Sequence, residues 1–163
     1  MFKEVYLLKN ILFTDATSQE ELFDVVADYM ESIAYVTKDY KQSVKSREEE
    51  FPTGLKIDLK DGTDTLFAAI PHTEPQYCLV ETVVYVKNEN PILFKHMINP
   101  SEECFVQDFF FIINNNKESQ TDILSNLITF FITKGNLDYL HKCDRDKESI
   151  ANYLTEKGVF QND

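Results

Sequence analysis

Two short stretches of the sequence carry side chains that could do chemistry together. His72 follows Pro71 directly, at the end of the apolar run 65–70, and Arg47 comes just before the sequence Glu-Glu-Glu-Phe-Pro-Thr-Gly. Because proline donates no backbone N–H and fixes φ, we expect the strand to stop at Pro71 and to carry His72 just past its end. Ligands of α/β proteins usually bind at such strand ends. The sequence therefore indicates His72 as an accessible imidazole at a sheet edge.

These residue types suit phosphoryl transfer through a phosphohistidine. A neutral ring nitrogen can attack phosphorus if the other nitrogen holds the proton. The planar fork of Arg47 can hold an oxyanion, and a helix that starts near Ser119 and Gln120 offers free N–H groups and partial positive charge. Such a transition state needs mainly positioning and charge stabilisation. We therefore expect phosphate carried covalently on His72, with no metal ion and no other cofactor.

Each of these residues also has an ordinary structural interpretation. A lone histidine is more often structural than reactive. Arg47 could pair with a neighbouring glutamate on a solvated helix face, as most helical arginines do. Ser119 and Gln120 could simply cap their helix. Taken alone, no single residue decides between the two interpretations.

The two stretches together resemble a known family. "REEEFPTGL" at 47–55 and "AIPHTEP" at 69–75 are similar to motifs of the type-2 IIA domains (fructose, mannitol and galactitol types) of the bacterial phosphoenolpyruvate-dependent sugar phosphotransferase system. The spelling R-x-x-E-F-P-T-G resembles the galactitol-specific branch most. The order of the expected helices and strands also matches the family over most of the chain.

The resemblance implies a role for each candidate residue. His72 would accept phosphate on Nε2 from the carrier HPr and pass it to a cysteine of a IIB subunit, which serves a IIC membrane permease. Arg47 would hold the transferring oxygens, and Thr53 and Gly54 would shape the turn beside them. Gln120 takes the place where mannitol- and fructose-type members carry a second active-site histidine, and it can donate a hydrogen bond but brings no positive charge.

Hydrophobic periodicity predicts the elements that must position these residues. We expect one α/β domain over residues 1–163, with a mixed sheet of about five strands sandwiched by helices. The expected strands are 5–13, 65–70, 78–86 and 104–113. Three of the expected helices cover 38–50, 136–143 and 146–158, and two more begin after Ser18 and near Ser119.

Composition narrows the classes of partner and compartment. The net charge of −12 makes nucleic acid and anionic membrane surfaces poor partners. We see no signal peptide and no apolar run of membrane-spanning length. Three widely spaced cysteines suggest reduced thiols in a cytoplasmic protein, and His72, His96 and His141 lack the spacing of a zinc site.

Two other functions compete with the phosphocarrier. The first is a regulatory IIA-like module, in which the phosphorylation state of His72 controls a binding partner. The second is a degenerate binding domain that retains the histidine without its chemistry. Phosphorylation by HPr and onward transfer to a IIB subunit would separate all three.

Overall fold

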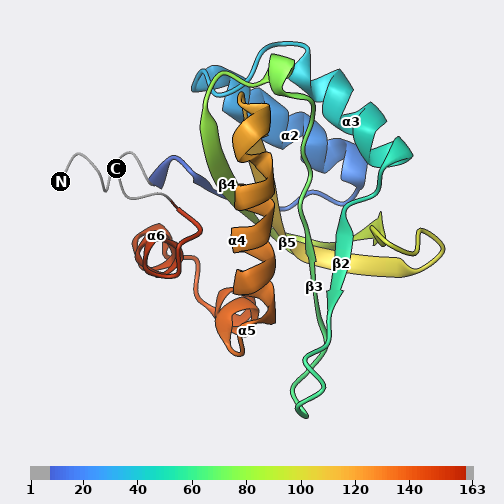
Figure 1. Cartoon of the computed structure of the whole chain (residues 1–163), viewed down its shortest axis with the longest axis vertical. Coiled ribbons are helices and arrows are strands. Elements are labelled where there is room, and N and C mark those ends of the chain that lie inside the picture. Colours follow the sequence, from blue (N-terminus) through green and yellow to red (C-terminus); the bar gives the residue numbers. More distant parts are fainter. Residues whose placement is uncertain (1–7, 161–163) are drawn as a thin grey trace.

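The computed structural model describes residues 8–160, in which helices cover both faces of a five-stranded mixed sheet (Figure 1). The strand order is β1-β4-β5-β3-β2. β1 runs parallel to β4 and β3 parallel to β5, whereas the β4–β5 and β2–β3 pairs are antiparallel. The strands are β1 (Ile11–Thr14), β2 (Gly54–Ile57), β3 (Leu66–Ala69), β4 (Glu81–Lys95) and β5 (Glu103–Asn114). The predicted fold class is confirmed.

The helices form two layers on opposite faces of the sheet (Figure 1). One layer holds α2 (Gln19–Ser32) and α3 (Tyr40–Glu50), and the other holds α4 (Gln120–Ile132), α5 (Asn136–Lys142) and α6 (Lys147–Glu156). The central strand β5 supplies both cores with alternate side chains: Phe109, Phe111 and Ile113 on the α2–α3 side, Phe110 and Ile112 on the other. This double burial explains its nearly continuous apolar sequence.

Local capping fixes several helix ends where the sequence predicts them. The Ser18 hydroxyl accepts a hydrogen bond from the Glu21 N–H at 3.1 Å, which starts α2. The carboxylate of Glu21 binds Thr17, not Ser18, so only half of the expected capping box forms. At the other end of the chain, α6 stops before Gly158, which has the positive φ of 82° that glycine tolerates best.

Strand β2 was not predicted, and it begins at Gly54, which the sequence interpretation places in a turn. Gly54 begins this strand, and a Cβ added there would lie 2.7 Å from the Lys95 carbonyl oxygen. Glycine is therefore required by the close approach of two backbones, with the Met97 N–H donating to the Gly54 carbonyl at 2.8 Å. The prediction that Gly54 shapes a turn is wrong for this reason.

Strand β4 starts later and runs further than the predicted 78–86. A short 3₁₀ helix, Pro75–Tyr77, precedes it, and pairing with β5 continues to Lys95 across a register shift between Lys87 and Ile92. Pro91 lies within this register shift. Proline usually marks the end of a strand in a sequence, but a bulge tolerates it, so the strand continues past the predicted end.

The predicted strand 5–13 corresponds in part to β1, and its residues 5–7 lie outside the described ones. Among residues 8–160, no helix combines the length and apolar character needed to cross a membrane.

Candidate active site

The segment that carries His72 is tied to the central strand. The Ile112 N–H donates to the Pro71 carbonyl at 3.0 Å, and His72 forms an isolated parallel bridge with Ile112. Proline lacks a donor, but its carbonyl still accepts, so pairing continues past Pro71. Strand β3 ends at Ala69, so the predicted strand end before His72 is confirmed, but the prediction that all pairing stops at Pro71 is wrong. This hydrogen bond and bridge hold His72 against β5, just past the end of β3.

The main chain selects which nitrogen of the His72 ring carries the proton. Nδ1 lies 2.7 Å from the carbonyl oxygen of Ile70, and because a carbonyl can only accept, Nδ1 donates. Nε2 of the neutral ring therefore keeps its lone pair. Burial has the largest effect and lowers the pKa of His72; the Ile70 bond opposes it, the charge of Arg47 lowers the pKa further, and Glu74 raises it slightly. The half-buried ring of His72 is thus neutral, and it adopts the tautomer that carries the proton on Nδ1.

Arg47 lies in the last turn of α3 and reaches toward the segment that follows His72. Its Nη1 is 2.8 Å from Oε1 of Glu74, and its guanidinium carbon lies 4.7 Å from the centre of the Phe51 ring. Among the described residues its buried Nε has no hydrogen-bond partner. The partner of Arg47 is therefore not a glutamate of its own helix, as the alternative interpretation assumed. Arg47 has no direct bond to His72, but it lies near enough for its charge to act on the imidazole.

Thr53 is buried behind the site and does not line it. It is 2 % exposed, and both its N–H and its hydroxyl donate to the buried carboxylate of Glu48 at 2.6 Å. Its carbonyl accepts from the Ile70 N–H at 3.2 Å. The carbonyl of Ile70 in turn orients His72. Thr53 thus acts on the imidazole through the backbone, and burial raises the pKa of Glu48 to about 7.

Gln120 is the first residue of α4, on the sheet face opposite α3. Its side chain is half-buried and makes no hydrogen bond within residues 8–160. Ser119 precedes the helix as its cap residue, and its hydroxyl donates to the side chain of Asn114 at 3.3 Å. Hydrogen bonds through Ile70 connect Thr53 with His72, and the charge of Arg47 acts on the same ring, whereas Gln120 takes part in none of these interactions.

Two functional candidates, Glu48 and Glu74, were missed by reasoning from the sequence. Glu74 lies two residues after His72 in the same motif, and Glu48 follows Arg47 directly. Acidic residues beside an arginine look like ordinary surface charge in a sequence. Only the folded structure shows that the carboxylate of Glu48 is buried against Thr53 and that the carboxylate of Glu74 binds Arg47.

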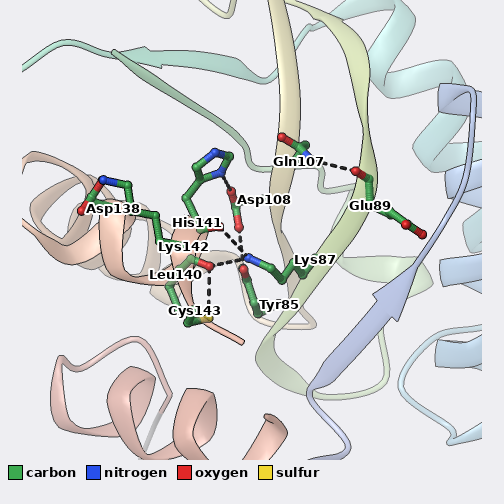
Figure 2. A network of polar contacts seen from close by, with 10 residues as sticks. All are labelled: Tyr85, Lys87, Glu89, Gln107, Asp108, Asp138, Leu140, His141, Lys142 and Cys143. Carbon is green, nitrogen blue, oxygen red and sulfur yellow. Dashed lines mark hydrogen bonds and ion pairs between the residues drawn. The ribbon is translucent and has the colours of Figure 1, made fainter. Parts of the chain in front are cut away.

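A second polar cluster links the end of α5 to strands β4 and β5 (Figure 2). Asp108 of β5 is 1 % exposed and accepts hydrogen bonds from the Tyr85 hydroxyl at 2.5 Å and from Nδ1 of His141 at 3.0 Å. The ammonium of Lys87 donates to the carbonyls of Leu140 and His141 at the end of α5. The hydrogen bond with Asp108 raises the pKa of His141. These bonds give His141 a structural role.

The remaining metal-ligating residue types are dispersed. Nδ1 of His96 accepts from the N–H groups of Ile98 and Asn99 in the turn after β4. Cys78 is buried, with its sulfur 3.7 Å from the Thr73 hydroxyl oxygen. In the described part of the chain, no three His, Cys, Asp or Glu side chains are grouped so that they could hold a metal ion.

Comparisons with solved structures show the same fold in several bacterial proteins. A putative IIA domain from Streptococcus pyogenes is 13 % identical and has a TM-score of 0.71, with 95 % of each chain covered. The crystal structure of the mannitol IIA of Escherichia coli is 18 % identical with a TM-score of 0.68, covering 90 % of this chain and 96 % of the other. The same protein is also known in complex with phosphorylated IIB.

A nitrogen regulatory protein IIA-Ntr from Neisseria meningitidis is 20 % identical and has a TM-score of 0.65, covering 91 % of this chain and 94 % of the other. At these identities the likeness establishes the fold alone. No curated protein sequence matches the chain significantly.

The sequence itself decides the family. The model of the family described as "Phosphoenolpyruvate-dependent sugar phosphotransferase system, EIIA 2" matches residues 6–157, nearly the whole chain. That range includes His72, Arg47 and the buried residues Glu48 and Thr53. The chain therefore belongs to the type-2 EIIA family of the phosphoenolpyruvate-dependent sugar phosphotransferase system.

Proposed function

We propose that this protein is a phosphocarrier, in which Nε2 of His72 accepts a phosphoryl group and passes it on. The observation that carries the proposal is the hydrogen bond from Nδ1 to the Ile70 carbonyl, which leaves Nε2 as the nucleophile beside Arg47. Membership of the EIIA family supports phosphoryl transfer in general. The residues and partners that follow are the specific content of the proposal.

The transfer needs no proton to leave His72. The Nε2 lone pair attacks phosphorus, an N–P bond forms as the bond to the donor nitrogen breaks, and the donor keeps that electron pair. The ring becomes positively charged, and the Ile70 carbonyl that accepts from Nδ1 stabilises this charge. Arg47 stabilises the equatorial oxygens of the loose transition state. In the second half-reaction a thiolate attacks, and His72 returns to the neutral ring.

We assign the donor to HPr and the acceptor to the cysteine of a IIB subunit, which hands the phosphate to sugar bound by a IIC permease. The known complex of mannitol IIA with phosphorylated IIB supports the second assignment. These partners would place the protein in the cytoplasm.

For the sugar, we propose galactitol or a related polyol. The support is the motif R-x-x-E-F-P-T-G at 47–54 together with Gln120 in place of a second histidine. With glutamine there, Arg47 is the main cation for the phosphate, and Gln120 contributes at most a neutral hydrogen bond. Growth and uptake assays with a panel of polyols test this assignment.

The decisive experiment incubates the chain with labelled phosphoenolpyruvate, Enzyme I and HPr. We expect an acid-labile phosphate on the wild type and none on His72→Ala. His96→Ala and His141→Ala serve as matched controls that keep the label. Arg47→Ala should be phosphorylated more slowly by a factor on the order of 100, the effect of removing one oxyanion donor. Label that persists on His72→Ala would refute the proposal.

A regulatory module is the second candidate, because the IIA-Ntr of Neisseria meningitidis has the same fold. Both functions begin with phosphorylation, so the step that separates them is donation. We expect the phosphorylated chain to lose its label to a cognate IIB subunit. Retention of the label in the presence of that subunit would favour the regulatory role.

A further inference from the structure

Glu74 forms an ion pair with the guanidinium of Arg47, which is the group that would bind the phosphoryl oxygens. Its Oε1 lies 2.8 Å from Nη1 of Arg47, and its Oε2 accepts from the Ser43 hydroxyl at 3.3 Å. Ser43 and Arg47 stand four residues apart on α3 and therefore face the same way. Two donors of one helix face thus hold one carboxylate, which lies only two residues from His72.

The cavity around this pair holds two further acidic residues among neutral polar ones. Together with Ser43, Arg47 and Glu74, the side chains of Asp39 and Glu50 line a cavity of about 440 Å³. The pair itself is only half-buried, since the side chains of Arg47 and Glu74 are 30 % and 45 % exposed. A half-exposed ion pair is worth little, so it can be exchanged for a stronger partner. A dianionic phosphoryl group is such a partner.

The electrostatic effects on the imidazole show that both charges act on the reacting group. Arg47 lowers the pKa of His72, whereas Glu74 raises it. The hydrogen bond from its own backbone N–H lowers the pKa of Glu74, and contacts with Arg47 and Ser43 add to this, so its carboxylate is ionised at neutral pH. The carboxylate would thus lie near the phosphoryl group as a full negative charge.

We propose that Glu74 is an intramolecular competitor of the phosphoryl group for Arg47, an inference that rests on the proposed phosphorylation of His72. In the free protein Glu74 holds the guanidinium. When the phosphoryl group arrives on Nε2, the guanidinium turns to its oxygens, and Glu74 is left as a nearby anion. The ion pair lost and the repulsion gained offset part of the stabilisation by Arg47. The phosphoryl group is therefore held loosely enough to be passed on.

The test measures the equilibrium of phosphoryl exchange between HPr and His72, and compares Glu74→Gln with wild type. Glutamine keeps an oxygen that accepts from Arg47 and removes the charge. We expect the equilibrium constant to shift toward phospho-His72 by about fivefold, the upper range for a half-exposed ion pair, and donation to IIB to slow. Glu50→Gln is the matched control, because Glu50 lines the same cavity and has no ion pair with Arg47 among the described residues.

A second measurement does not depend on turnover. In the unphosphorylated protein, NMR titration of the His72 ring should give a lower pKa in Glu74→Gln than in wild type, since Glu74 raises it. The proposal is overturned if Glu74→Gln is phosphorylated less completely than wild type, because Glu74 would then be an anchor that Arg47 requires. It is also overturned if Glu50→Gln shifts the equilibrium equally. If wild type itself takes no phosphate, the proposed function fails, and the His72 titration still reports whether Glu74 acts on the ring.

Discussion

At the scale of single residues, the reactivity of His72 is set by groups that never touch a substrate. The Ile70 carbonyl fixes the tautomer, burial and Arg47 lower the pKa, and Glu74 acts against both. The sequence identified the imidazole and the guanidinium from their types and order. It could not identify Glu74 as the partner of Arg47, because 27 residues separate them and several nearer glutamates were available.

The lowered pKa of His72 predicts an acid limb for its phosphorylation. Only the neutral ring attacks phosphorus, so the rate should fall with falling pH around a midpoint below the ordinary value of 6.5. Arg47→Gln should raise that pKa, because a positive charge beside the ring is removed. Arg145→Gln, which changes the only other arginine of the chain, is the control. An NMR titration that gives the same His72 pKa in all three proteins would contradict the prediction.

The buried carboxylate of Glu48 predicts an unusual dependence of stability on pH. Its pKa of about 7 in the folded protein lies above the ordinary 4.5, so the folded state binds more protons between these values. This contribution to stability is fully present below about pH 4.5 and is lost as the pH rises through 7. Glu48→Gln has no titrating carboxyl at this position. From pH 5 to pH 8 the free energy of unfolding of wild type should therefore fall relative to that of Glu48→Gln.

Urea unfolding at pH 5 and pH 8 measures this difference. Glu48→Ala should lose about 2–4 kcal/mol, because it removes two buried hydrogen bonds and leaves a cavity. Glu49→Gln, an exposed neighbour on the same helix, controls for the change in net charge. A difference between Glu48→Gln and wild type that does not vary with pH would show that Glu48 does not titrate in this range.

At the scale of elements, prediction succeeded where a segment carries its own pattern. The double-sided apolar strand β5 and the capped helix α2 are read directly from spacing and cap residues. Strand β2 was missed because it is only four residues long, begins with the glycine of Pro-Thr-Gly, and acquires its strand form from pairing with β3 and with the residue after β4. The extent of β4 was missed for a related reason, since its second half depends on pairing with β5.

The tight approach at Gly54 gives a prediction for the β2 element. In Gly54→Ala the new methyl would meet the Lys95 carbonyl, so β2 must move and Thr53 with it. We expect a loss of about 1–3 kcal/mol in the free energy of unfolding and a disturbed His72 ring signal. Lys56→Ala, at an exposed position of the same strand, should change stability much less. Equal losses in the two variants would show that the strand, not the contact, limits stability.

At the scale of the whole molecule, charge is the dominant feature. The chain has 28 acidic and 16 basic residues, and its net charge is −12. Folding brings these charges closer, and the resulting repulsion opposes the compact state. The ion pairs that the described residues form are mostly exposed and individually weak, so they offset little of it.

Added salt should therefore stabilise this protein. Raising NaCl from about 0.02 to 0.2 M shortens the screening length from roughly 20 to 7 Å, so repulsion between distant surface charges falls. We expect Tm to rise over this range, as measured by circular dichroism at constant pH. A fall in Tm would mean that attractive pairs outweigh the general repulsion.

The bond between Ile112 and Pro71 has a consequence for how a partner meets the site. The reactive segment shares a backbone hydrogen bond with the innermost strand, which two packed layers clamp. Native-state hydrogen exchange at the Ile112 amide should then be about as slow as global unfolding allows. The segment that carries His72 is therefore already ordered before a partner protein binds, so binding costs little conformational entropy. A small, short-lived interface is then enough for transfer of the phosphoryl group.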